Sequence, residues 1–556
     1  MPLNSYEFML IFLPITFVGY TVLQTRLSRR IALSWLLLAS VTFYLPSGML
    51  GFALVGFSIL WDFVAARLFL AMPAVRAKAR TLVIYAAIVA DVLFLCYFKY
   101  INVLLETKVP TLFPHLLSTS AYLPLGLSFL TFQKIGFLTD LRSGLIKDVQ
   151  LFDFMLFGLF FPKAIAGPIT RYNEFTVQIR NPELTVRYTD TTVGVCMLAI
   201  GLFKETVMAS IAGQFVPDVF EPAYPLEPVD LLSAWFGALA YTFQLYFEFS
   251  GYSDMALGSA RLFGIKLPMN FNSPFKAHNL AEFWGRWHIT LTRFLTWQIY
   301  IPMVRHITKW RAATGRSVLR GMSSRMPAIV FLIGVPTLVT MTISGVWHGS
   351  GWTYILWGFI HGVCLAICQG WRLLRGRFFS DDVAYKRVMG SLGHVLTFLV
   401  VVGALVVFRA DSVHSAVGIL KGMLGLNGLT PEYLQILMKH DPQANWLFIM
   451  FNSSWYPALC LGSMMWILMR APNSLDLLRS LHPALDFLQD GGDAQVTRSG
   501  VAPEGSESNA SIGGGLVIAR GSGPPLTLFV AVLYAAFLVL GISAIERSGK
   551  FIYGQF

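Results

Sequence analysis

Two histidines, each placed directly after a tryptophan, are the residues best suited to chemistry in this 556-residue chain. His288 lies in the stretch FWGRWHITLTRF, and His348 follows sixty positions later in SGVWHGSGW. His348 also lies in a run of 46 residues, 326–371, that contains no Asp, Glu, Lys or Arg. A neutral imidazole can take a proton from a hydroxyl group, which is the step that acyl transfer to an alcohol requires.

The composition predicts that these histidines lie within a membrane protein. Hydrophobic residues make up 55% of the chain and charged residues 13%, whereas a soluble domain carries about 25% charged residues. Apolar stretches of roughly 20 residues, the length that crosses a bilayer, recur throughout. We therefore expect an all-α polytopic membrane bundle with about eleven to thirteen transmembrane spans around a central tunnel. The candidate spans are 6–24, 31–46, 49–66, 81–105, 120–138, 151–168, 191–213, 232–260, 286–304, 327–346, 350–371, 391–408, 445–469 and 526–545.

The chain is expected to form one membrane domain, 1–556. Three of the candidates, 120–138, 151–168 and 286–304, could instead be re-entrant or lie along the interface. The segment 486–525 is rich in Gly, Ser and charge, which predicts a flexible polar loop before the last span.

Basic residues predict the orientation, because cytoplasmic loops carry an excess of Lys and Arg. One basic cluster, 26–30, follows the first span, and another, 67–80, follows the third. Both are cytoplasmic if the N-terminus lies outside. The net charge of +12 then reflects this bias and attraction to anionic lipid, and nucleic acid is not expected as a partner. The five cysteines have no zinc-like spacing, so we expect neither a metal site nor a disulfide framework.

The surroundings of His348 favour a functional role. Gly345, Gly349 and Gly351 allow the helix to break here and the backbone to be approached closely. A break at membrane depth is tolerated only where it is buried in protein or lines a water-filled cavity. The alternative is a polar turn residue at the level of the lipid headgroups. His361, on the following helix, is expected to pack.

The spacing around His288 predicts a helix that begins at Asn279, with Glu282 in a capping-box position. In that helix Trp284, His288 and Thr292 would share one face. Either His288 is functional, or it belongs to an aromatic belt and makes a single hydrogen bond. The polar residues in 241–254 either line a tunnel or hold helices together by interhelical hydrogen bonds.

Seven segments in order resemble the membrane-bound O-acyltransferase family, and within it the bacterial polysaccharide branch that includes the alginate O-acetyltransferase membrane subunit. They are PLGLSFLTFQKIGFLTD, FFPKAIAGPITRY, FEFSGYSDMALGSARLFGIKLPMNFNSPF, EFWGRWHITLT, SGVWHGSGWTYILWGFIHG, VVFRADS and the terminal FIYGQF. The chain departs from that branch at Gly285, where a basic residue is common, and at TWQIYIP, where an Arg-Asp pair is usual.

The resemblance implies that His348 is the catalytic base and that His288 is the second required histidine. Residues of the same motifs, Trp287, Asn270, Asn272 and Trp347, are expected to bind substrate. The implied acyl donor is acetyl-CoA on the cytoplasmic side, and no metal is implied. The implied acceptor is a cell-surface or exported polysaccharide, reached directly or through a periplasmic acetyltransferase or esterase-like partner protein. The resemblance places the chain in the bacterial cytoplasmic (inner) membrane as a multi-pass protein of exopolysaccharide biosynthesis.

Two other functions remain open at this point. One is D-alanyl transfer to teichoic acid, which the chain length and the alginate-type motifs disfavour. The other is a polytopic transporter or flippase, which would be expected to show charge pairs within its spans and internal repeat symmetry. Neither feature is evident in the sequence.

Overall fold

The structure is a computed structural model that describes residues 1–108, 124, 126–183, 185–220, 228–319, 325–379, 382–429, 446–485 and 528–545. The described residues form helices and connecting loops, with one isolated β-bridge between Pro268 and Leu485 and no strand. This confirms the predicted all-α class. The segment 486–525, predicted to be a polar loop, lies outside the described residues.

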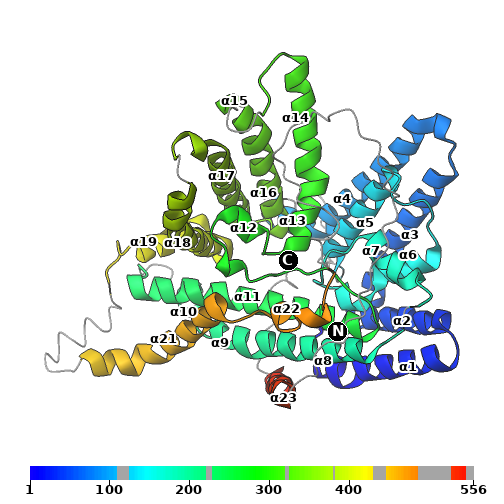
Figure 1. The fold of residues 1–556 in the computed structure, drawn as a ribbon, viewed down its shortest axis with the longest axis horizontal. Coiled ribbons are helices and arrows are strands. Elements are labelled where there is room, and N and C mark those ends of the chain that lie inside the picture. The colour runs from blue at the N-terminus through cyan, green and yellow to red at the C-terminus, as the bar shows by residue number, and fades with distance from the viewer. Residues whose placement is uncertain are drawn as a thin grey trace.

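Three groups of helices are arranged around the middle of the molecule (Figure 1). One group comprises α1 (Leu13–Arg26), α2 (Arg29–Tyr44), α8 (Tyr188–Phe203) and the long α11 (Leu231–Leu262). A second comprises α3 (Met49–Ala71), α4 (Ala77–Lys108) and α5 (Leu127–Arg142). The third comprises α14 (Ile301–Ala313), α15 (Met326–Ile329), α16 (Val335–His348), α17 (Trp352–Leu374) and α18 (Asp382–Arg409).

Shorter helices connect and cover these groups. They are α6 (Leu151–Leu159), α7 (Tyr172–Arg180), α9 (Ser210–Gly213), α10 (Pro217–Phe220), α12 (Leu280–Trp284), α13 (Ile289–Leu295), α19 (Val413–Met423), α21 (Trp446–Arg470), α22 (Ser474–Leu477) and α23 (Leu528–Ser543). Four short π-helical segments interrupt or extend the longer helices, at Glu7–Phe12, Lys204–Ala209, Thr296–Tyr300 and Val330–Gly334.

Seven helices among the described residues are long and apolar enough to cross a membrane, fewer than the eleven to thirteen spans expected. They are Glu7–Arg26, Met49–Ala71, Ala74–Tyr100, Tyr188–Gly213, Met326–His348, Trp352–Arg377 and Arg387–Arg409. The three doubtful candidates contain shorter helices. For example, α6 ends at Leu159, and the 286–304 region is divided between α13 and α14. The chain is a multi-pass membrane protein.

Close glycine contacts hold the long helices α8 and α11 side by side (Figure 1). A Cβ atom on Gly201 would lie 2.6 Å from the carbonyl oxygen of Gly251, and one on Gly258 would lie 2.7 Å from that of Gly194. Small residues allow this backbone approach, as is usual between membrane helices. The π-helical segment Lys204–Ala209 continues from α8 at the end of this contact.

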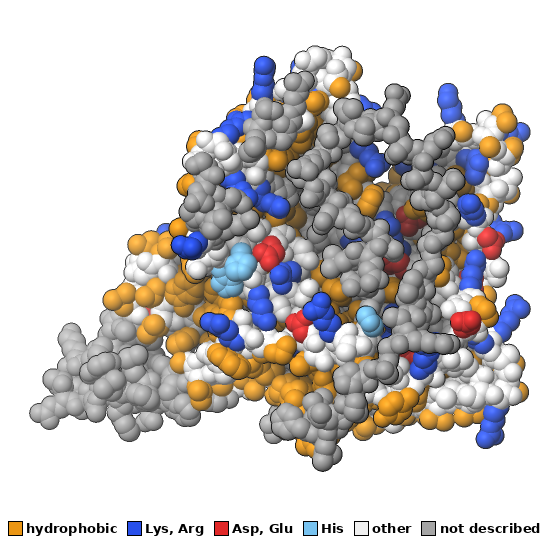
Figure 2. All heavy atoms as spheres, viewed as in Figure 1, with side chains coloured by type: hydrophobic (Ala, Val, Ile, Leu, Met, Phe, Trp, Pro, Cys, Tyr) orange, Lys and Arg blue, Asp and Glu red, His pale blue; other side chains and the backbone are white. Residues whose placement is uncertain are grey.

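Buried ion pairs also join the helices, which corrects the view that charge pairs are absent from the spans. Lys204 pairs with Asp254 at 2.6 Å, and Arg261 pairs with Asp190 at 3.0 Å. The polar residues of 241–254 therefore serve at least partly to hold helices together. Figure 2 shows hydrophobic side chains along the edge formed by α8 and α11, with Lys and Arg side chains over the middle of this face and at the ends of the helices opposite.

Candidate active site at two buried histidines

His288 lies between two short helices rather than inside one. α12 ends at Trp284, His288 has a left-handed backbone with φ of 44°, and α13 begins at the next residue. The expectation that Trp284, His288 and Thr292 share a helix face is therefore wrong. The loop before α12 causes the break, because the backbone N–H of Ile289 donates to the carbonyl of Asn270 at 2.9 Å. A left-handed non-glycine residue costs about 1–3 kcal/mol, and such strain is found most often at functional sites.

The start of α12 agrees with the predicted cap in one respect. The Asn279 side chain accepts from the backbone N–H of Glu282 at 2.9 Å, as expected. The return contact of Glu282 goes to the N–H of His278, not to that of Asn279. The predicted helix start is confirmed, and the reciprocal capping box is not.

Asn270 orients the His288 imidazole. The Asn270 Oδ1 atom lies 2.9 Å from Nδ1 of His288 and also accepts from the Thr290 hydroxyl at 2.9 Å. The Asn270 amide nitrogen donates to Ser253 on α11 at 3.2 Å. Because Oδ1 can only accept, Nδ1 of His288 must carry the proton. The lone pair of a neutral His288 is therefore on Nε2, which is buried and has no hydrogen-bond partner among the described residues.

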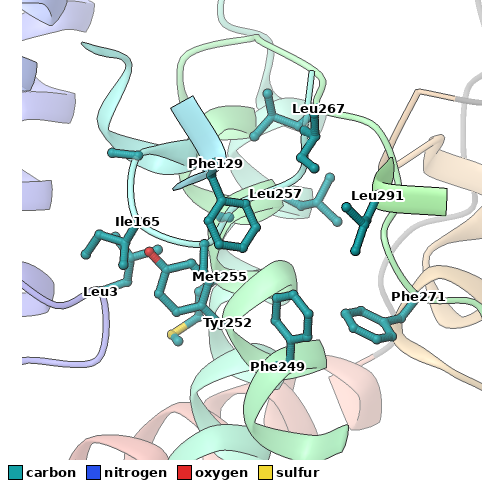
Figure 3. Packing of buried hydrophobic residues seen from close by; sticks show 14 of the residues in the cluster. Leu3, Phe129, Ile165, Phe249, Tyr252, Met255, Leu257, Leu267, Phe271 and Leu291 are labelled. Atoms are coloured by element: carbon teal, nitrogen blue, oxygen red, sulfur yellow. The ribbon is translucent and has the colours of Figure 1, made fainter. Parts of the chain in front are cut away.

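Aromatic rings surround this imidazole. The centroid of the His288 ring lies 4.8 Å from that of Phe249, 6.2 Å from Phe129 and 6.4 Å from Phe271. Figure 3 shows these three phenylalanines converging from α11, α5 and the loop before α12. His288 lies outside the seven long spans, and burial lowers the pKa of its side chain to about 3. The imidazole is thus neutral at physiological pH and acts as a hydrogen-bond acceptor.

His348 is the last residue of α16, where the predicted helix break occurs. Its side chain is buried, with ring centroids 4.6 Å from Trp347, 5.1 Å from Trp357 and 5.2 Å from Phe408. The indole nitrogens of both tryptophans are buried and have no hydrogen-bond acceptor among the described residues. Each of the two tryptophans that contact His348 therefore carries an N–H donor without an acceptor among the described residues.

The glycines near His348 serve the turn between α16 and α17. A Cβ atom on Gly345 would lie 2.3 Å from the carbonyl oxygen of Tyr354, and one on Gly349 would lie 2.3 Å from its ring. Gly351 has only ordinary contacts, the nearest at 3.5 Å. The close approach expected at these glycines is made by Tyr354 at Gly345 and Gly349.

Phe129 and Lys99 connect the surroundings of the two histidines. Phe129 packs against the His288 ring and against Trp347, whose centroid is 5.7 Å away. The Lys99 ammonium donates to the carbonyl of Trp347 and lies 5.1 Å above its indole ring. Both Lys99 and His288 are close enough to His348 for Coulombic interactions.

Two narrow cavities adjoin this centre. Cavity 1 reaches the rings around His348, and cavity 2 reaches Thr290, the residue that shares Asn270 with His288. About 10 Å³ is open in cavity 1 and about 20 Å³ in cavity 2, room for about one water molecule each, so substrates require side chains to move. Cavity 1 is lined by Leu245, Phe283, Trp284, Trp287, Trp357, His361, Val401, Leu405 and Phe408. Cavity 2 is lined by Phe132, Gln133, Gly136, Ile169, Thr170, Arg171, Thr290, Arg293, Phe294, Trp297 and Gln298.

Comparison with known proteins identifies the family. The sequence profile of the MBOAT, membrane-bound O-acyltransferase family, matches residues 81–319. The peptidoglycan O-acetyltransferase of Helicobacter pylori is 34% identical over 77% of this chain and 80% of its own length. The probable alginate O-acetylase of Pseudomonas aeruginosa is 33% identical over 75% of this chain and 73% of its own length. The chain belongs to the membrane-bound O-acyltransferase family.

A third relative of this MBOAT protein aligns with a smaller part of the chain. The teichoic acid D-alanyltransferase of Streptococcus thermophilus is 31% identical, over 44% of this chain and 57% of its own length. The MBOAT chain described here is an O-acyltransferase. The transporter and flippase alternatives are not supported by these relatives.

The remaining residues predicted for this MBOAT site lie at different distances from the histidines. Trp287 lines cavity 1, and Trp347 lies between His348 and Phe129. Asn272 lies farther out, where its side-chain oxygen accepts from Asn473 at 3.0 Å. His361 packs as expected, because its Nδ1 accepts from the Trp284 indole at 3.3 Å.

Asn270, predicted to bind substrate, orients His288 in this structure. Two further residues of the site, Thr290 and Lys99, were not predicted from the sequence. Lys99 is a cation near the end of an apolar span, and that was the one available signal, since charges within membrane segments are functional candidates.

Proposed function

We propose that this protein moves acetyl groups from acetyl-CoA to hydroxyls of a cell-surface or exported polysaccharide, in the cytoplasmic membrane of a bacterium. The extent of similarity supports acetyl over D-alanyl transfer. The two acetyl-transferring relatives align with three quarters or more of the chain, whereas the D-alanyltransferase aligns with less than half.

His348 acts as the general base. As the acceptor oxygen attacks the thioester carbonyl carbon, Nε2 or Nδ1 of His348 takes the hydroxyl proton. The tetrahedral intermediate collapses with loss of the carbon–sulfur bond, and the imidazolium returns the proton to the departing thiolate. The products are an O-acetyl ester and a free thiol, with no net proton released.

The groups around His348 support this role. The indole N–H groups of Trp347 and Trp357 are donors available to the carbonyl oxygen, whose negative charge grows in the transition state. The Lys99 ammonium adds a positive charge beside Trp347. A water-excluding site strengthens these interactions and limits hydrolysis of the donor.

His288 positions substrate. The Nδ1 atom of His288 is hydrogen-bonded to Asn270, so only Nε2 can bind a ligand. Nε2 does so by accepting a hydrogen bond from a hydroxyl or an amide N–H. The observation that carries the proposal is the arrangement of these parts. Two buried imidazoles are linked through Phe129 and Trp347, and each shares neighbouring residues with a different cavity.

The charge distribution supports donor entry through cavity 2. Arg29, in the basic cluster predicted to be cytoplasmic, donates to the carbonyl of Gln178 at 3.1 Å, near the end of α7. Arg171, at the other end of this helix, lines cavity 2. Nine residues of helix span roughly 14 Å, so Arg171 lies within about this distance of the Arg29 contact, which supports an opening of cavity 2 toward the cytoplasmic side.

Acceptor entry is assigned to the side of cavity 1. α16 follows the basic segment 305–325 and ends at His348, a span away. The positive-inside rule therefore puts His348 toward the outer side. The acceptor is either the polysaccharide itself or a periplasmic acetyltransferase or esterase-like protein that passes the acetyl group on.

The test is acetyl transfer in membranes supplied with labelled acetyl-CoA and the acceptor polymer. His348→Ala and His348→Gln are expected to lose transfer by about 10²–10⁴-fold with normal expression and folding. His288→Ala is expected to lose less, with part of the loss in KM. His306→Gln, a change at an exposed histidine on α14, is the matched control and is expected to keep full transfer. Wild-type transfer rates in both His348 variants would contradict the proposal, and a greater loss in His288→Ala would exchange the two roles.

A further inference from the structure

A second group of buried charges lies away from the histidines, where α3, α4 and α5 meet. The Lys134 ammonium on α5 lies 3.1 Å from Asp62 on α3 and 2.5 Å from Asp91 on α4. All three side chains are at most 4% exposed, and Asp62 is fully buried. Lys134 also donates to the carbonyl of Ser58 at 3.3 Å.

The charges of this triad do not balance if both carboxyls are ionised. Two carboxylates and one ammonium leave one negative charge inside an apolar helix junction, and an uncompensated buried charge costs several kcal/mol. No further cationic side chain lies in contact with the triad among the described residues.

The triad also lacks hydrogen-bond donors for some of its carboxyl oxygens. With both carboxyls ionised, Oδ1 of Asp62 and Oδ2 of Asp91 are buried without a donor among the described residues. The two carboxyls lie close to each other, because one oxygen of each contacts the same Lys134 ammonium, at 3.1 Å and 2.5 Å. One proton between them supplies the missing donor and cancels the excess charge.

We infer that Asp62 and Asp91 hold one proton between them, opposite Lys134, and so form a proton-binding site within the membrane. Like charges at such short range favour a shared proton. The site is separate from the proposed acyl transfer, which releases no net proton.

The triad fixes the helix that forms one wall of the active site. Gln133, next to Lys134, lines cavity 2, as does Phe132. Phe129, on the same helix, packs against His288 and Trp347. Losing the shared proton would leave a buried negative charge at the base of this wall and loosen α5.

The proton can be counted by infrared difference spectroscopy, through the C=O stretch of protonated carboxylic acids. Asp62→Asn and Asp91→Asn each leave one carboxylate opposite Lys134 and are expected to lose one protonated-acid band. Lys134→Met leaves two carboxyls that must both be protonated and is expected to gain one. Asp254→Asn is the matched control, because Asp254 pairs one-to-one with Lys204 and is expected to lose no such band.

A second measurement needs no variant. A protonated carboxyl adds across a C=N bond of a membrane-permeable carbodiimide: its proton goes to nitrogen and its oxygen bonds to the central carbon. An adduct on the peptide containing Asp62 or Asp91 is therefore expected in the wild type. The inference is overturned if neither Asn variant loses a protonated-acid band. It is also overturned if the carbodiimide labels Lys134→Met and not the wild type. Where the Asn variants do not fold, the carbodiimide comparison decides.

Discussion

At the scale of single residues, the two histidines differ in how they are held. Asn270 fixes the tautomer and direction of His288, whereas aromatic rings and the end of α16 fix His348. Oriented histidines with a committed ring nitrogen are common at catalytic sites, because the second nitrogen is then available in one defined direction.

Asn270→Ala is expected to lower transfer by up to about tenfold, since a hydrogen bond of this kind contributes roughly 0.5–1.5 kcal/mol. Asn270→Asp, which keeps an acceptor for Nδ1, is expected to restore part of the loss. Steady-state kinetics on folded variants measure this. Equal losses in both variants, or no loss in either, would contradict the proposed role of Asn270 in orienting His288.

The tryptophans around His348 allow a sharper test of charge stabilisation. Trp357→Phe keeps the ring and removes the N–H, so kcat is expected to fall by about 10²–10³-fold with little change in the donor KM. Trp310→Phe, at an exposed position on α14, is the control. A change confined to KM would show that Trp357 shapes the cavity and does not stabilise the transition state.

At the scale of helices and loops, the sequence predicted some breaks and missed others. The break at His348 was predictable, because glycines follow an apolar run of helical length. The break at His288 was not. The local spacing fits a continuous helix, but pairing with the loop 270–272, which lies 14 to 19 residues earlier in the sequence, replaces helical hydrogen bonds there. The Lys134–Asp62 ion pair could not be predicted either, because its partners are 72 residues apart in the sequence.

The segment in which the chain departs from its family forms part of cavity 2. TWQIY adopts a π-helix, a form frequent at functional sites, and the Arg171 guanidinium lies 5.6 Å from the ring of Trp297. Trp297→Ala is expected to raise the KM for acetyl-CoA and leave kcat nearly unchanged, because the side chain lies at the cavity and away from both histidines. Leu27→Ala, an exposed apolar truncation elsewhere, serves as the control in the same titration. An unchanged KM would place the donor outside cavity 2.

At the scale of the whole molecule, the composition was sufficient to predict an all-α membrane protein, and charge clusters predict which side each loop faces. That orientation can be measured directly. A single cysteine introduced near Arg29 in a background without reactive cysteines is expected to resist an impermeant thiol reagent in intact cells and to react after permeabilisation. Ready labelling in intact cells would invert the topology and exchange the sides of the two cavities.

The proposed function requires acyl transfer at His348 between substrates that arrive from opposite faces of the membrane. It is tested most directly in oriented proteoliposomes that enclose labelled acetyl-CoA, with acceptor polymer or partner protein outside only. With the wild-type protein, label is expected on the outer acceptor. His348→Gln, inserted to the same extent, is expected to give no label above protein-free vesicles. Equal labelling by His348→Gln, or labelling by the wild type only when both substrates share one side, would contradict it.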